Sequence, residues 1–221
     1  MKKNFIVFLM FSLIFGLTAS AHADLITNGS FEDAPTISIP SDGYTTLDSG
    51  NTGITGWKVG DVGNIDLIST YWQPAPDGGS RSIDLNGTAP GSISQTFATI
   101  TDTQYQVRFA MAGNPDYISE KTLEASAGDF VGTFSFTNIQ GTTTLNDMRW
   151  LYYDFIFTAA GEFTTLTFKS LVSRPQEAPY WGPTLDDVSV VNAPVPEPAT
   201  MFLLGSGLIG IGIFVRRKFK R

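Results

Sequence analysis

The side chains that could do chemistry in this chain are carboxylates and aromatic rings. Its 221 residues include one histidine and no cysteine, and the histidine, His22, lies in a segment that we expect to be removed. Ser–His–Asp triads, Cys–His pairs and histidine-rich metal centres are therefore excluded from the mature protein. Hydrolysis by carboxylates alone stays open, because it needs only two acids that face each other at about 5 to 10 Å.

Asp186 and Asp187 occupy adjacent positions in the segment LDDVSVV, residues 185–191. Neighbouring side chains on a strand point to opposite faces, so Asp186 shares the face of Val188 and Val190, which reads as the core side. A carboxylate in a core is costly unless it is paired or bound to a metal. Two interpretations stay open: a metal ligand, or a side chain that accepts backbone amides or caps a turn.

Two aromatic pairs lie in segments rich in turn residues. Tyr71 and Trp72 run into QPAPDGG, and Tyr180 and Trp181 run into Gly182. Large amphipathic rings are less expected in loops than in a core, and a sugar can stack its C–H groups on such rings. The rings could equally pack down as a lid on the end of a sandwich. Polar side chains that could bind sugar hydroxyls follow the first pair: Gln73, Asp77, Arg81 and Asn86.

The elements that must position these residues are short β-strands. Apolar and polar residues alternate in QYQVRFAMAG (104–113), FVGTFSF (130–136), WLYYDFIFT (150–158) and FTTLTFKSL (163–171). No window of helical length shows a sustained 3.6-residue period, and clusters of Gly, Pro, Asn and Asp separate the runs. Residues 34–56 are interpreted as a long loop with one short strand. The pattern predicts one all-β domain over residues 24–193, a sandwich or barrel of antiparallel sheets, with Trp57 and Phe155 in its core.

The N-terminus has the order of a secretory signal peptide. Two lysines precede an apolar run over residues 5–17, and small residues follow and end at Ala23. We therefore predict a signal peptide over residues 1–23, cleaved after Ala23. An exported domain without cysteine has no disulfides, so its stability must come from its own hydrophobic core.

The C-terminus, residues 194–221, combines three parts. The triplet Pro196, Glu197 and Pro198 is held extended by its prolines and precedes an apolar segment over residues 199–215. As a helix this segment would span about 25 Å, just enough for one transmembrane helix. The basic residues 216–221, RRKFKR, would stay on the cytoplasmic side, which places the body outside.

The charge is distributed unevenly along the chain. The net charge is -7 overall, but residues 24–193 contain seven basic and twenty acidic residues, a balance of -13. A surface this acidic argues against nucleic acid and anionic lipid as partners, since phosphates require clusters of Lys and Arg. It suits solubility or a bound cation.

Four segments of the body together form a specific combination: DLITNGSFED (24–33), GWKVG (56–60), IDLISTYWQPAPDGGSRSIDLNGTAPGSISQTF (65–97) and GPTLDDVSVV (182–191). Through them the chain resembles the choice-of-anchor C family of exported bacterial domains, which is similar in turn to the galactose-binding-like jelly rolls and many carbohydrate-binding modules. The resemblance implies a jelly-roll β-sandwich of the galactose-binding-like type and a carbohydrate ligand. It also implies a structural calcium site, for which Glu32 would join Asp186 and Asp187.

The triplet, the single span and the basic cluster at the C-terminus resemble the PEP-CTERM sorting signal. That resemblance implies export through the secretion translocon and transient residence in the inner membrane. It further implies cleavage by an exosortase in a Gram-negative bacterium that makes exopolysaccharide. The alternative is a plain C-terminal membrane anchor.

These expectations combine into one hypothesis, an exported β-sandwich at the cell surface or in the exopolysaccharide matrix that serves as a non-catalytic binding module, with carbohydrate as its ligand. Two alternatives stay open: a structural matrix protein without a defined ligand, and a carboxylate-dependent glycosidase.

Overall fold

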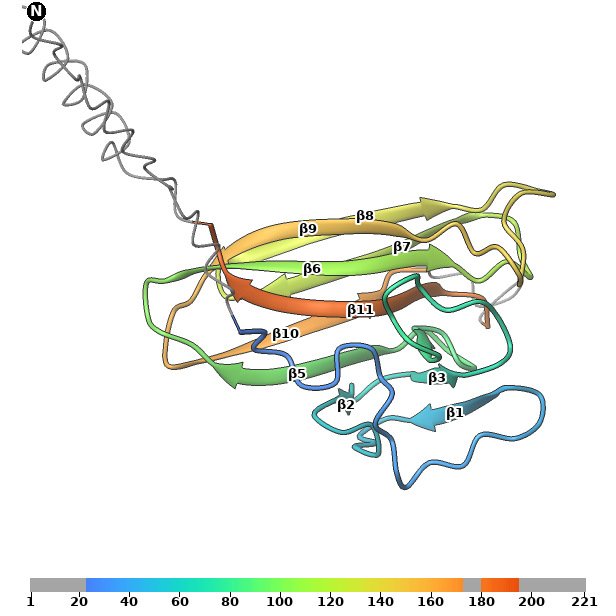
Figure 1. Ribbon diagram of the computed structural model, residues 1–221, viewed down its shortest axis with the longest axis horizontal. Coiled ribbons are helices and arrows are strands. Elements are labelled where there is room, and N and C mark those ends of the chain that lie inside the picture. The colour runs from blue at the N-terminus through green and yellow to red at the C-terminus, as the bar shows by residue number, and fades with distance from the viewer. Residues whose placement is uncertain (1–22, 173–179, 195–221) are drawn as a thin grey trace, which may run out of the picture.

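The computed structural model describes residues 23–172 and 180–194, which form strands and loops (Figure 1). Within these ranges no helix is long and apolar enough to cross a membrane. The predicted signal peptide up to residue 22 and the predicted sorting tail from residue 195 onward lie outside the described residues. The tail includes Pro196, Glu197, Pro198 and the apolar segment 199–215.

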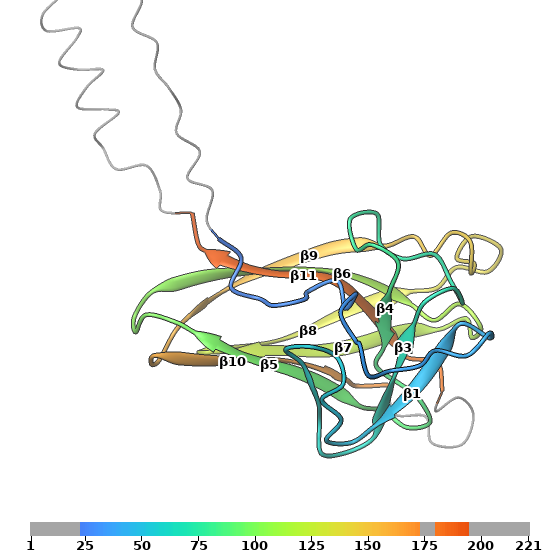
Figure 2. The same cartoon turned by 60° about the horizontal axis from the view of Figure 1, so that its bottom comes forward.

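The described residues form strands β1 (Tyr44–Asp48), β2 (Lys58–Val59), β3 (Asn64–Ile68), β4 (Ser82–Asp84), β5 (Ser92–Ala98), β6 (Gln104–Gly113), β7 (Glu120–Ala127), β8 (Phe130–Thr137), β9 (Leu151–Thr158), β10 (Phe163–Ser170) and β11 (Pro183–Asn192). One sheet has the order β1-β3-β4-β11-β6-β9 and the other β2-β5-β10-β7-β8. Figure 2 shows the two sheets as stacked layers. The predicted all-β jelly-roll sandwich is confirmed.

The core lies between the sheets and is built from the alternating residues that the sequence pattern identified. In β6, Tyr105, Val107, Phe109 and Met111 are all buried. The Phe109 ring centroid lies 4.9 Å from that of Phe168 on the opposite sheet. Trp57 and Phe155 are buried as predicted. Period-two alternation produces this core because every second side chain of a strand points to the same face.

The N-terminal and C-terminal segments of the domain lie side by side. The backbone amide of Leu25 donates to the carbonyl of Val190 at 2.8 Å, and the amide of Val190 donates to Asp24 Oδ1 at 2.9 Å. Residues 24–26 therefore run beside β11 without forming a named strand. Farther back along β11, the register with β6 shifts between Asp186 and Ser189, and Asp187 has φ +44°. This bulge re-aims the Asp187 side chain.

Three short strands at one end of the six-stranded sheet, β1, β3 and β4, carry the region of interest. β3 pairs with both neighbours, with Asp66 opposite Thr46 of β1 and opposite Asp84 of β4. Its residues from Ile65 to Ile68 are all buried, so both faces of the strand are covered. The polar side chains of Asp66 on β3 and Asp84 on β4 are therefore buried.

Candidate functional site

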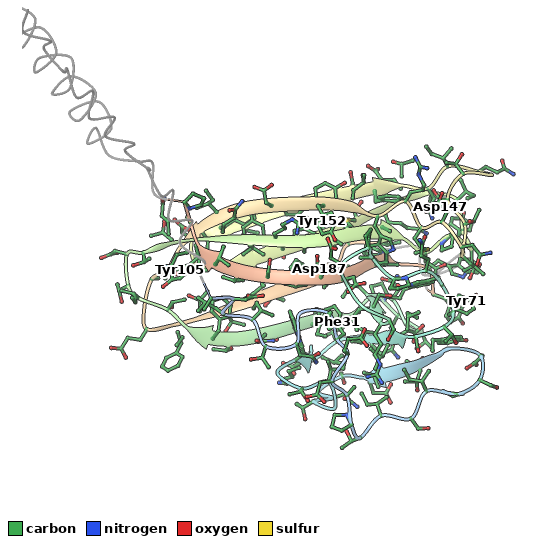
Figure 3. The ribbon with its side chains drawn as sticks, viewed as in Figure 1. Phe31, Tyr71, Tyr105, Asp147, Tyr152 and Asp187 are labelled. Carbon is green, nitrogen blue, oxygen red and sulfur yellow. The ribbon has the colours of Figure 1, made fainter. Side chains whose placement is uncertain are left out.

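A cavity of about 340 Å³ lies at this end of the six-stranded sheet. Figure 3 shows Tyr71 at this end of the sandwich and Tyr105 at the opposite end. Strands β1, β3 and β4 and the loops that follow β3, β4 and β6 contribute to its wall, together with the residues before β11. The lining residues are Tyr44, Thr46, Asp66, Ile68, Tyr71, Trp72, Asp84, Gly87, Thr88, Asn114, Asp116, Tyr180 and Trp181.

Two buried carboxylates form the floor of the cavity. Asp66 and Asp84 are register partners on adjacent strands and are both at least nine-tenths buried. Directly opposite residues of an antiparallel pair have their Cβ atoms about 5 Å apart, so the two carboxylates are neighbours. Thr46 Oγ1 donates to Asp66 Oδ1 at 2.6 Å. Asp84 accepts from Asn114 Nδ2 at 2.8 Å and from the Gly182 amide at 3.0 Å.

Burial dominates the ionisation of both groups. Desolvation raises the pKa of Asp66 to about 6, against the hydrogen bond from Thr46, which lowers it. Desolvation raises the pKa of Asp84 to about 8, against the hydrogen bonds from Asn114 and Asn86, and the nearby Asp66 raises it further. The pair therefore retains a proton near neutral pH, because two adjacent buried carboxylates do not ionise together easily.

Aromatic rings form the walls. Tyr71 lies between Tyr44 and Trp72, with ring centroids 5.3 and 5.6 Å away and near edge-to-face geometry. The Tyr71 hydroxyl donates to Asp116 Oδ2 at 2.6 Å, and this bond raises the pKa of Tyr71 to about 12. On the other side, Tyr180 has its ring edge-to-face with that of Trp181 and is 52% exposed. Free ring surface is therefore available at the mouth.

All four aromatic residues singled out in the sequence line this one cavity. Two of them, Trp72 and Trp181, are also packed against other residues of the domain. Trp72 is 4% exposed, belongs to the hydrophobic core, and donates from Nε1 to Ser82 Oγ at 2.8 Å. Trp72 therefore packs down on the end of the sandwich, which was the alternative to a sugar-stacking role. Trp181 stacks on Tyr117 with centroids 5.3 Å apart and planes inclined by 6°. Its ring is held in place before any ligand arrives.

The four polar residues predicted to accompany the first pair, Gln73, Asp77, Arg81 and Asn86, are not among the residues that line the cavity. The Gln73 side chain lies against the loop before β9, where its Oε1 accepts from the Met148 amide at 3.4 Å, and its backbone carbonyl accepts from Trp150 Nε1 at 3.0 Å. Asp77 Oδ2 accepts from the hydroxyl of Tyr152 at 3.3 Å. Arg81 donates its backbone amide to Glu32. The reason is that the chain turns away after Trp72 and crosses the sheet face, so neighbours in sequence point elsewhere.

Sequence reasoning missed the polar side chains that do line the cavity, namely Tyr44, Asp66, Asp84, Asn114 and Asp116. A signal for two of them was present. The tripeptide Ile-Asp-Leu occurs at residues 65–67 and again at 83–85. The repeat places the two acids at equivalent strand positions, although period-two alternation alone would assign an acid between two aliphatic residues to the solvent face. Nothing in the sequence pairs the two copies, because their register depends on how β3 and β4 meet.

Glu32 and Asp186 hold the loop that follows this region. Glu32 Oε1 accepts the backbone amides of Ser80 and Arg81 at 2.6 and 2.7 Å. Asp186 Oδ2 accepts the amide of Ala75 at 2.9 Å. A Cβ on Gly78 would lie 2.1 Å from Asp186 Oδ2, so the close approach of the loop requires glycine. The two carboxylates therefore anchor residues 75–81 to the chain ends.

This arrangement does not fit a calcium site. Backbone N–H groups point at the oxygens that a cation would need, and the described residues contain no group of three acidic, histidine or cysteine side chains suited to a metal. Asp187 is turned away by the bulge and lies 3.8 Å from Arg108 Nη1. Asp186 is buried and satisfied by amides, the alternative left open by its position. Calcium binding stays a prediction without support from this geometry.

A thermal melt tests the calcium prediction. We expect EDTA and excess calcium to give superimposable curves for residues 24–193, because amides already satisfy Glu32 and Asp186. Asp186→Asn should lower the melting temperature equally in both conditions. A bound ion at about a hundredfold over its Kd would instead add ~2.7 kcal/mol, a shift of several degrees that EDTA reverses. That result would show a calcium site.

Known proteins resemble this chain in fold and in sequence. A family 35 carbohydrate binding module from Clostridium thermocellum matches 67% of this chain and 99% of its own, with a TM-score of 0.44 and 12% identity. A CBM35 structure from Paenibacillus barcinonensis matches the same shares with a TM-score of 0.41 and 16% identity. Likeness at this level concerns the fold alone, so function has to be inferred from the site.

Halomucin from Haloquadratum walsbyi is 30% identical over 182 residues, which is 82% of this chain. The chain spans about 2% of the length of that relative. Residues 194–218 match the PEP-CTERM protein-sorting motif, which confirms the resemblance at the C-terminus and identifies an exported protein. Residues 24–191 match the family described as protein of unknown function (DUF642). The chain therefore belongs to the DUF642 family.

Proposed function

We propose that this protein is an exported, non-catalytic module that binds carbohydrate in the cavity at the end of the six-stranded sheet. The observation that carries the proposal is one open cavity of about 340 Å³ whose lining combines five aromatic rings with carboxylate, amide and hydroxyl groups. Ligand pockets in proteins have volumes of this order and a few convergent polar groups.

The arrangement of aromatic rings and polar groups in the cavity suits a sugar ring. Tyr180 and Trp181 offer flat surfaces near the mouth, on which the C–H groups of a pyranose can stack. Asp116, Thr88 and Asn114 provide hydrogen-bonding groups around those surfaces. Trp181 is pre-oriented by its stacking on Tyr117, which reduces the entropy lost on binding. Repeated rings with polar groups between them would bind one or two units of a polysaccharide.

The sorting motif suggests where binding takes place. A PEP-CTERM tail supports a route through the secretion translocon and an inner-membrane intermediate, followed by cleavage by an exosortase. In a Gram-negative cell the product would be the body at the cell surface or in the exopolysaccharide matrix. The acidic body, with twenty acids against seven bases, is consistent with a hydrated polysaccharide environment and not with nucleic acid.

Truncating the rings at the mouth should weaken glycan binding. We expect Tyr180→Ala and Trp181→Ala each to raise the Kd about threefold to tenfold, since an aromatic contact is worth ~0.5 to 1.5 kcal/mol beyond burial. Trp72→Ala is unsuitable, because removing a buried tryptophan costs ~3 to 5 kcal/mol of stability. Isothermal titration with the oligosaccharide selected on a glycan array gives the values.

Phe163→Ala is the matched control, since this ring is 69% exposed and does not line the cavity. Its Kd should equal that of the wild type. Equal affinities for wild type, Tyr180→Ala and Trp181→Ala would place the ligand elsewhere. Failure of the intact domain to bind any glycan, its host matrix included, would favour the alternative of a structural matrix protein.

The pair of carboxylates is the feature that a carboxylate-dependent glycosidase would use. Asp66 and Asp84 are cross-strand partners with neighbouring side chains, and retaining glycosidases use two carboxyl groups about 5 Å apart. Asp84, however, accepts hydrogen bonds from Asn114, Asn86 and Gly182, which fix it in the floor of the cavity. We therefore propose binding without turnover. Release of reducing sugar from a bound oligosaccharide, lost in Asp66→Asn, would establish the glycosidase instead.

A further inference from the structure

The cavity is acidic as well as aromatic. Three carboxylates line it, those of Asp66, Asp84 and Asp116, and among the described lining residues none is lysine, arginine or histidine. Carboxylates can accept hydrogen bonds from the hydroxyls of a neutral sugar, whereas an acidic sugar would be repelled by them. Asp66 and Asp84 retain one proton between them near neutral pH, so the lining carries less than the full charge of three carboxylates but still a net negative charge.

The basic residue behind the wall, Lys121, acts on Asp84 by lowering its pKa, so the negative charge offered to a ligand is mainly that of Asp66 and Asp116. Lys121 is fully buried, and its Nζ donates to the carbonyl of Trp181 at 2.8 Å and lies 5.3 Å from the Tyr117 ring centroid. Its ammonium supports the Trp181 backbone from behind and has no exposed surface. The side that a ligand meets carries the carboxylates and the ring faces.

Ring faces and carboxylates together favour a positive charge. The negative face of an aromatic quadrupole attracts cations, and this attraction grows where water is partly excluded. Tyr71 reinforces the effect, because its hydroxyl donates to Asp116 and fixes that carboxylate beside the aromatic wall. An ammonium group would meet carboxylate oxygens and rings in one place, as in the cages that bind organic cations.

We propose that the cavity selects sugars that carry a protonated amine, such as the de-N-acetylated hexosamine units of a cationic polysaccharide. This inference rests on the proposed carbohydrate function and adds the substrate class. The sugar ring stacks at the mouth on Tyr180 and Trp181, and the ammonium points inward to Asp66 and Asp116. N-acetylation would remove the charge and add an acetyl group that the carboxylates do not favour.

The test uses an array of hexosamine oligomers of matched length and linkage, each present as the free amine and as the N-acetyl form, with neutral and uronic acid oligomers beside them. The folded domain, residues 24–193, should bind the amine form about tenfold more tightly than its acetylated partner, a difference of about 1.4 kcal/mol. Asp66→Asn and Asp116→Asn should each reduce that preference.

Two controls separate this result from general attraction of cations to an acidic protein. Asp61→Asn removes an 87% exposed carboxylate outside the cavity and should leave the preference intact. Trp181→Ala should weaken amine binding in proportion to the lost stacking. If Asp66→Asn does not fold, Asp116→Asn decides, because Asp116 is exposed.

The possible outcomes are distinguishable. Equal binding of amine and N-acetyl forms, both reduced by Trp181→Ala, would overturn the amine selectivity and leave the carbohydrate proposal standing. An affinity for the amine form that is the same in wild type, Asp116→Asn and Trp181→Ala would overturn the inference, because the cation would then bind elsewhere. Absence of binding to every oligomer and polysaccharide would overturn both.

Discussion

Replacement of Pro196, Glu197 and Pro198 by alanine is expected to abolish sorting and to leave the protein at full length in the inner membrane. The triplet lies within residues 194–218, which match the PEP-CTERM protein-sorting motif. From the sequence alone we expect the prolines at both flanks to disfavour a helix and to favour an extended backbone. A processing enzyme could bind an extended segment of this kind, whereas alanines would favour helix formation through the triplet. The expected effect is a loss of nearly all processed product.

Mass spectrometry of the cell-surface fraction measures this directly. Wild-type protein should lack residues 216–221, and the triple-alanine variant should retain them in the membrane fraction. A matched control replaces Pro40 and Asp42, a proline and an acid in an exposed turn of the body. That variant should be processed normally. Surface-exposed wild-type protein that still carries RRKFKR would show that the segment is a plain anchor.

Raising the pH from about 5 to about 8 is expected to lower the free energy of unfolding by several kcal/mol. Burial raises the pKa of Asp84 and of Asp186 to about 8, and that of Asp66 to about 6, from an ordinary value of 3.8. The folded protein therefore keeps protons on these groups that the unfolded chain has already lost near pH 4. The stability that these three groups contribute is fully present at low pH and is lost as the pH rises through their folded pKa values.

The sign follows from the number of bound protons. The free energy of unfolding changes with pH by 2.303RT times the protons bound in the unfolded state minus those bound in the folded state. The folded state holds more, so the slope is negative, at most about 1.4 kcal/mol per pH unit for each group. Asp129, whose pKa is lowered by the Thr158 amide, acts in the opposite direction but below this window.

Urea unfolding at several pH values supplies the measurement. Asp84→Asn should flatten the slope, because it removes one group that takes up the proton, while Asp61→Asn, at an exposed site, should leave the slope unchanged. Asn at residue 84 keeps an oxygen for the amides of Asn86 and Gly182 and loses the bond from Asn114. A stability that is flat or rising between pH 5 and pH 8 would contradict the buried, protonated state of these carboxylates.

Much of this architecture could be predicted from local pattern. Alternation in residues 104–113 and 163–170 places Val107, Phe109, Leu166 and Phe168 in the core, as observed. The sorting motif at residues 194–218 is likewise a linear signal, recognised from the order of its parts. Such features are readable because period-two alternation and short motifs depend only on neighbours in the chain. The signal peptide and the membrane span stay predictions, since residues 1–22 and 195–221 lie outside the described structure.

The cavity could be predicted only in part. The rings at residues 71, 72, 180 and 181 stood out by composition, yet Trp72 proved to be a core residue and Trp181 a residue held by stacking. The polar residues next to them in sequence, such as Gln73 and Asp77, point away from the cavity. Sequence proximity failed here because a loop that crosses a sheet face changes direction within a few residues.

The acidic character of the site was decided by tertiary structure. Asp66 and Asp84 become neighbours only because β3 and β4 pair in one register, and a shift of one residue would turn the two side chains to opposite faces. The bulge in β11 turns Asp187 toward Arg108, and backbone amides bind Glu32 and Asp186, so the calcium site implied by the resemblance stays a prediction that this geometry does not support. Local sequence determines which residues can be buried. Register, bulges and strand order determine which of them meet, because these depend on the packing of segments far apart in the chain.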